Sequence, residues 1–168
     1  MNKGLIKAII WVIGTGIAVG MLVANSMIEV RTFELIIGIT FIIMGIISRT
    51  TSDARFVGLI TIIVGVLNVL SGSLEMAMPD NETLVIVRYA AFGIWYLTMV
   101  CFEIKDVTAA FRYNEKLVGI TGVIFLVFLI LSAVFYFWWM LTLFVVFYIL
   151  AVLANLIYNI LFQVKISS

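Results

Sequence analysis

Long apolar runs, bounded by charged residues, divide this chain. There are six of them, at about 5–25, 32–48, 56–74, 83–102, 117–136 and 140–163. A helix needs about 20 residues to cross a hydrocarbon core of about 30 Å, and these runs have that length. The pattern predicts an all-α fold, a polytopic transmembrane bundle of six helices. We expect residues 1–168 to form a single transmembrane domain.

The fifth and sixth runs come from one uncharged stretch, Leu117 to Val164. As one helix it would be about 70 Å long, because an α-helix rises 1.5 Å per residue. That is more than twice the hydrocarbon thickness, so the stretch must fold back. We expect the turn within Tyr136 to Met140, because Trp and Tyr prefer the membrane interface.

The composition agrees with a membrane environment. Hydrophobic residues make up 65% of the chain, charged residues only 11%, and the mean hydropathy is +1.28. A soluble domain has about 25% charged residues. The net charge is +1 and Lys and Arg form no run, so membrane lipid is an expected partner and nucleic acid is not.

The residues needed for most enzyme chemistry are missing. The chain has no histidine, and Cys101 is its single cysteine. This excludes haem ligation by histidine, HExxH zinc hydrolysis and the Ser-His or Cys-His nucleophiles. No pair of carboxylates and no Ser/Lys arrangement can be placed together as a catalytic site. We therefore expect no catalytic residue, no metal site and no cofactor, and an enzyme is the least favoured class.

The distribution of Lys and Arg over alternate loops predicts the orientation. Arg31 and Arg88 belong to one side. The other side holds the remaining basic residues, which are Lys3, Lys7, Arg49, Arg55, Lys105, Arg112, Lys116 and Lys165. Both termini are therefore expected in the cytoplasm. We expect the first run to be kept as a helix, because Val23 to Met27 lacks a small-x-small signal-peptidase site.

Two connections carry further expectations. The acidic loop with Glu75, Asp80 and Glu82 is expected on the external side. The segment from Glu103 to Lys116 has apolar residues at helical spacing. It fits a short interfacial helix or a solvated loop that continues the fourth helix.

Glycines recur at helical spacing in three of the runs. Gly38 and Gly45, and likewise Gly58 and Gly65, lie seven residues apart, which places each pair on one helix face. In the first run Gly16 and Gly20, followed by Ala24, form a stripe at spacing four. Such stripes allow close helix approach, so we interpret them as packing or partner faces rather than a substrate path.

Short spans, abbreviated loops and the Gly-Ile repeats at Gly38-Ile39 and Gly45-Ile46 resemble the small HdeD-like acid-resistance membrane proteins, mainly over residues 33–132. The resemblance implies a small polytopic protein of a prokaryotic plasma membrane. It supplies no catalytic residues. Length and topology are also similar to the substrate-binding subunits of energy-coupling factor vitamin transporters, a topological analogy only.

Two ionisable residues are expected inside the membrane. Glu34 lies 15 residues before Arg49, and Arg88 lies 15 residues before Glu103. If Arg49 and Glu103 mark the cytoplasmic boundary, both are at the same depth, about 22 Å from it. A lone buried charge is costly, so we predict a contact between Glu34 and Arg88 in the outer leaflet. The alternative is that Arg88 reaches outward to the headgroups or to Glu82 and that Glu34 caps a short helix.

Further polar residues fall near that depth. Asn68, Ser132 and Tyr148 lie within one or two turns of it. They fit an external pocket around Arg88 that takes a small or amphipathic, anionic ligand, or else separate interhelical hydrogen bonds. In the sixth run Asn155 and Asn159 share a face with Tyr148, which is either a partner interface or a path.

The favoured hypothesis is a membrane protein that binds or transports such a ligand without catalysis. The alternative is a structural or accessory subunit that packs against other membrane subunits, or against copies of itself, through the glycine stripes and the polar face of the sixth helix.

Overall fold

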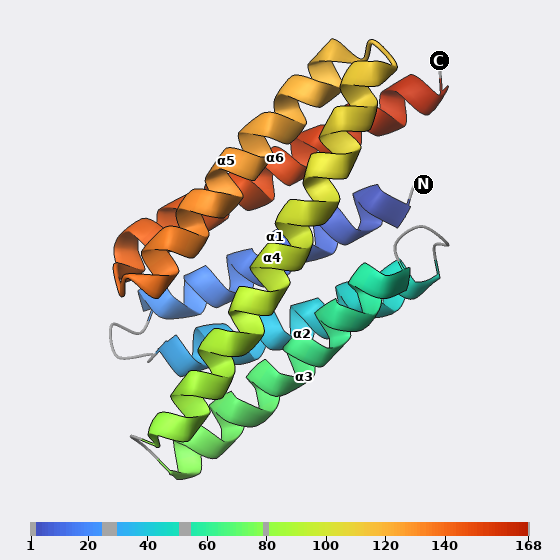
Figure 1. Cartoon of the computed structure of the whole chain (residues 1–168). Helices are drawn as coiled ribbons and strands as arrows, with labels where there is room; N and C mark the ends of the chain where they lie inside the picture. The colour runs from blue at the N-terminus through green and yellow to red at the C-terminus, as the bar shows by residue number, and fades with distance from the viewer. Residues whose placement is uncertain (1–2, 25–29, 51–54, 79–80, 168) are drawn as a thin grey trace. The chain divides into compact units, whose positions relative to one another are not determined.

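The computed structural model describes residues 3–24, 30–50, 55–78 and 81–167. Six α-helices follow one another, and the six predicted helices are thereby confirmed (Figure 1). Each is long and apolar enough to cross a membrane. Residues 25–27 of the segment considered for cleavage, and Asp80 of the acidic loop, lie outside the described residues. The helices are α1 (Lys3–Ala24), α2 (Val30–Arg49), α3 (Arg55–Ala77), α4 (Glu82–Arg112), α5 (Lys116–Phe137) and α6 (Leu141–Ser167).

The helices form two compact units. The first unit comprises Met1–Val12 and Tyr96–Ser168, and the second comprises Ile13–Trp95. Because the boundaries fall within α1 and α4, each of these helices contributes to both units. The expectation of a single domain stays a prediction.

The second unit is built on the pair α2 and α3, which run side by side (Figure 1). A methyl group at Gly38 would lie 2.9 Å from the carbonyl oxygen of Gly65, and one at Gly45 would lie 2.7 Å from that of Gly58. The two backbones therefore touch at two levels, two helical turns apart. Only glycine allows this approach, so the structure places all four glycines at the helix interface.

The part of α1 in this unit packs through a different glycine from those singled out in the sequence. A methyl group at Gly14 would lie 2.7 Å from Thr40 Cγ2. Gly16 and Gly20 are exposed, and no atom of the described chain lies within 4 Å of a methyl group added there. No described residue therefore packs closely on this stripe of α1. A role as a partner face stays a prediction.

Aromatic side chains fill the interior of each unit. In the second unit Phe41 stacks on Trp95, with ring centroids 4.3 Å apart. In the first unit Trp11 Nε1 donates a hydrogen bond of 2.7 Å to the hydroxyl of Tyr148, and the Trp11 ring meets Phe125 edge to face. These five side chains are almost fully buried, which makes them core residues.

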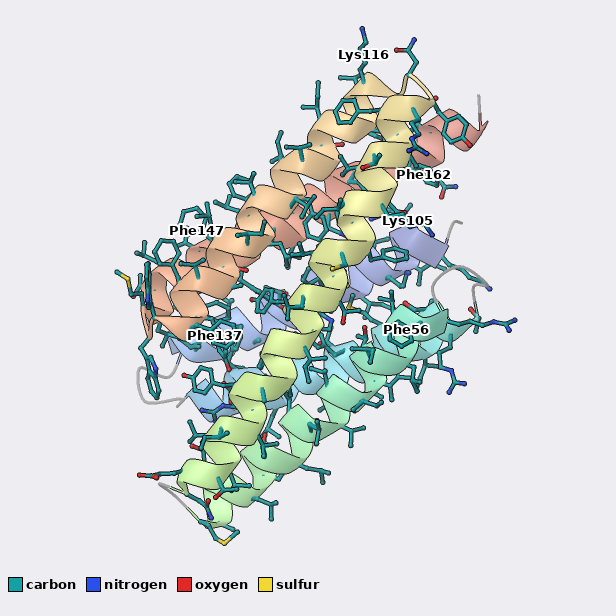
Figure 2. All side chains as sticks on the ribbon, in the orientation of Figure 1. Phe56, Lys105, Lys116, Phe137, Phe147 and Phe162 are labelled. Atoms are coloured by element: carbon teal, nitrogen blue, oxygen red, sulfur yellow. The ribbon has the colours of Figure 1, made fainter. Side chains whose placement is uncertain are left out.

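The hairpin of α5 and α6 has the turn that the sequence predicts, between Phe137 and Leu141. Trp139 adopts a left-handed backbone conformation with φ 58°. The amide N–H of Met140 donates a hydrogen bond of 3.0 Å to the carbonyl oxygen of Phe135. The amide N–H of Trp139 donates one of 3.2 Å to the carbonyl oxygen of Tyr136. These two bonds define a Schellman motif, which normally carries glycine at the left-handed position. Figure 2 shows Phe137 at this turn and Lys116 at the opposite end of α5.

The helix α4 is longer than the sequence predicts. It continues without interruption through Glu103 and ends at Arg112, and Asn114, two residues further on, has a φ of 61°. The expectation of a separate interfacial helix is wrong; of the alternative, a solvated loop that continues the fourth helix, the continuation is confirmed, but the segment is helical rather than a loop. The reason is the apolar spacing itself, since Val107 and Ala110 are buried within the first unit and keep the chain helical.

Candidate functional site

The second unit holds one arginine between two carboxylates. Arg88, on α4, has its Nη1 2.9 Å from Glu34 Oε2 on α2. The same nitrogen donates a hydrogen bond to Glu75 Oε2 on α3. Three helices thus converge on one guanidinium nitrogen, and we call Glu34, Glu75 and Arg88 the Glu-Arg-Glu cluster. The predicted contact between Glu34 and Arg88 is confirmed.

The cluster is buried. The relative exposure is 1% for Glu34 and 5% for both Glu75 and Arg88. Charged side chains at such depth need partners, because transfer of an isolated ion out of water costs several kcal/mol or more. Arg88 therefore does not reach outward to solvent, and the alternative of an outward-reaching Arg88 is wrong.

Glu75 is the cluster member that the sequence analysis missed. It was expected in an external acidic loop, but α3 extends past it to Ala77. The mistake came from treating a charged residue as the end of the helix. A better signal was Pro79, because proline commonly follows a helix end by one or two residues.

The charge of the cluster limits its chemistry. A guanidinium is always protonated in proteins, and the three side chains of the cluster comprise one guanidinium and two carboxyl groups. The Nη1 of Arg88 already donates a hydrogen bond to Glu75 and forms an ion pair with Glu34, so the charge of the guanidinium is balanced within the cluster. A metal ion has few ligands here. Within the described residues, no group of three or more His, Cys, Asp or Glu side chains is placed to hold one.

The other predicted pocket residues form hydrogen bonds of their own. Asn68 Nδ2 donates to the carbonyl of Val64 at 2.9 Å within α3. Ser132 Oγ lies 3.1 Å from the hydroxyl of Tyr96, and Tyr148 accepts the bond from Trp11. Ser132 and Tyr148 belong to the first unit, whereas the Glu-Arg-Glu cluster belongs to the second. A shared pocket around Arg88 therefore stays a prediction.

The polar face of α6 is partly satisfied within the helix. Asn159 Nδ2 donates to the carbonyl oxygen of Asn155 at 2.8 Å and to its side-chain oxygen at 3.1 Å. Both side chains are half-buried. A role of this face in binding a partner subunit stays a prediction.

No protein-family model, curated protein or solved structure matches the chain. The resemblance to HdeD-like proteins therefore stays a prediction.

Proposed function

We propose that this chain is a small multi-pass membrane protein that binds and moves a small monovalent cation at the Glu-Arg-Glu cluster. The observation that carries this proposal is that Glu34 and Glu75 share one guanidinium nitrogen in a buried site. The cluster has one carboxylate more than it has cations. A mobile cation that binds there neutralises the excess charge.

The geometry favours a cation over the anion expected from Arg88 alone. An unpaired arginine in a membrane interior would attract carboxylate or phosphate. Here the arginine is already neutralised, and ionisable groups buried in membrane helices commonly mark proton or ion pathways. The candidate ligands are a proton, or an organic ammonium ion that replaces the guanidinium as a partner of one carboxylate.

The orientation of the chain belongs to the same proposal. If every helix crosses the membrane, the helix ends with Lys3, Arg49, Arg55, Arg112 and Lys116 all lie on one side. The rule that positively charged loops stay in the cytoplasm then places both termini there. Glu75, near the end of α3, and Arg88, near the start of α4, then lie towards the external side.

The test is cation flux into vesicles. The purified chain is reconstituted into liposomes of phosphatidylethanolamine and phosphatidylglycerol. Proton entry is followed with an enclosed pH-sensitive dye, methylammonium entry with a radiolabel, and acetate entry serves as the anion arm. The variants are Glu34→Gln and Glu75→Gln, each of which removes the excess charge and leaves Arg88 one carboxylate. Glu82→Gln, at an exposed position on α4, is the matched control.

We expect either the proton or the methylammonium arm to respond to both variants and not to the control. Loss of one ionic partner costs about 1.5–3 kcal/mol, which is a loss of affinity of about ten- to a hundredfold. The proposal is wrong if both variants pass cations as fast as the unmodified chain, or if only acetate entry depends on the cluster.

A structural or accessory subunit is the second candidate, and the open face of α1 at Gly16 and Gly20 favours it. The glycines of α2 and α3 do not favour an accessory subunit, because they already pack these two helices against each other within the chain. The vesicle assay separates the two candidates, since an accessory subunit on its own carries no cation flux.

A further inference from the structure

The first unit contains a buried carboxyl group that the Glu-Arg-Glu cluster does not involve. Glu103, in the second half of α4, is 4% exposed. Its Oε1 is fully buried and has no hydrogen-bond partner in the part of the chain that the structure describes. Most buried polar atoms in proteins have a partner, so this exception needs an explanation.

The surroundings of Glu103 are close-packed backbone and rings. On α5, a methyl group at Gly122 would lie 3.4 Å from Glu103 Oε1 and 2.6 Å from Val107 Cγ2. The same position lies 3.4 Å from Cε2 of Tyr158 on α6. The glycine therefore lets α5 approach the carboxyl group, and the helices close over it rather than leaving it to water.

Three titratable groups act on this site from the packed helices. Asp106 lies one turn further along α4 and adds a second negative charge beside Glu103. Tyr158 of α6 interacts electrostatically with both carboxyl groups. Lys7 of α1 interacts electrostatically with Asp106, the other carboxyl group. From α5 the neighbour is Gly122, which has no side chain.

An ionised carboxylate in this position would be costly. A buried charge with no hydrogen bond is strongly disfavoured relative to its neutral form. Binding of either a metal ion or a proton would offset the free-energy cost of the buried carboxylate. A hard metal ion requires about six oxygen ligands, and no group of three or more suitable side chains is placed to supply them among the described residues.

We propose that Glu103 is a proton-binding site, which holds a proton on its carboxyl group within the first unit. The proton converts the buried carboxylate to a neutral acid between Gly122, Tyr158 and Asp106. The inference rests on the first unit alone and does not depend on the function proposed for the Glu-Arg-Glu cluster.

The test uses the full chain in lipid vesicles at neutral pH. Dicyclohexylcarbodiimide, an apolar reagent, modifies carboxyl groups that carry a proton in an apolar environment. After the reaction, peptide mass spectrometry locates the label, and infrared spectroscopy of untreated samples detects the carbonyl stretch of a protonated acid. The variants are Glu103→Gln, which has the same shape, and Glu82→Gln as the exposed control.

We expect the label on the peptide that contains Glu103. We also expect an infrared band of a protonated acid that is absent in Glu103→Gln and unchanged in Glu82→Gln. The band alone also supports the proposal, since close packing can keep the reagent out. Absence of both label and band at Glu103 would overturn it. Because the cluster is tested by cation flux and Glu103 by its own peptide and band, either proposal can fail while the other stands.

Discussion

The two units have the same kinds of ionisable residues and arrange them in opposite ways. The second unit brings two glutamates onto one arginine nitrogen. In the first unit two carboxyl groups, Glu103 and Asp106, lie close together, and Lys7 is a basic residue that acts on this pair. There the buried carboxyl group, Glu103, has no hydrogen bond at Oε1 within the described residues, and Lys7 interacts with Asp106 instead.

The number of charged residues in a unit therefore does not determine whether a buried carboxyl group there has a fixed ionic partner. In the second unit the arginine is a fixed partner of both glutamates, so their ion pairs contribute to the fold. In the first unit no fixed partner meets Glu103 Oε1 in the described chain, so a proton is the simplest means of neutralising it. The Glu-Arg-Glu cluster is an ion-pair network to which we propose a mobile cation binds, whereas Glu103 binds its proton without an arginine beside it.

The largest effect should come from removal of the shared arginine. Arg88→Gln leaves Glu34 and Glu75 buried without their cation, and breaking a buried pair in this way costs about 3–5 kcal/mol. The free energy of unfolding is measured in detergent micelles. Arg112→Gln, at an exposed position at the end of the same helix, is the control. Equal stability of the two variants would show that the cluster does not hold the second unit together.

A smaller effect should distinguish the packed and open glycines of the second unit. In Gly45→Ala the new methyl group meets the backbone at Gly58 O, 2.7 Å away, and at Ile62 N, 2.8 Å away, so α2 and α3 must separate. Such overpacking costs about 1–3 kcal/mol. Gly20→Ala is the matched control, because its methyl group enters open space and favours the helix by about 0.5–1 kcal/mol. If both substitutions destabilise equally, close helix approach is not what requires Gly45.

The helix number and the Glu34–Arg88 contact could be predicted from the sequence for a physical reason. Apolar length fixes which segments cross a membrane, and position along a rigid helix fixes depth. Two residues of opposite charge at equal depth are then expected to form an ion pair, because an unpaired charge in the membrane is costly. The turn at Trp139 was also predicted, although no glycine marks it, because the stretch is too long for one helix.

Glu75 and Glu103 were not predicted to be buried, and the cause is the same for both. Each stands at the edge of an apolar run, where a charge usually marks the water boundary. Whether the helix continues past such a charge depends on what packs against it, Arg88 in one case and Gly122 in the other. Those partners are distant in the sequence, so the local pattern of apolar and charged residues does not indicate them.

The smallest effect should separate Glu103 from the glutamates of the cluster. If Glu103 is already a neutral acid, Glu103→Gln exchanges one neutral group for another of nearly the same shape. The free energy of unfolding at neutral pH should then change by less than about 1 kcal/mol. Glu75→Gln is the matched comparison, since it removes an ionic partner of Arg88 and should cost about 1.5–3 kcal/mol. A loss at Glu103→Gln as large as at Glu75→Gln would mean that Glu103 is ionised and paired, which would make the two units alike.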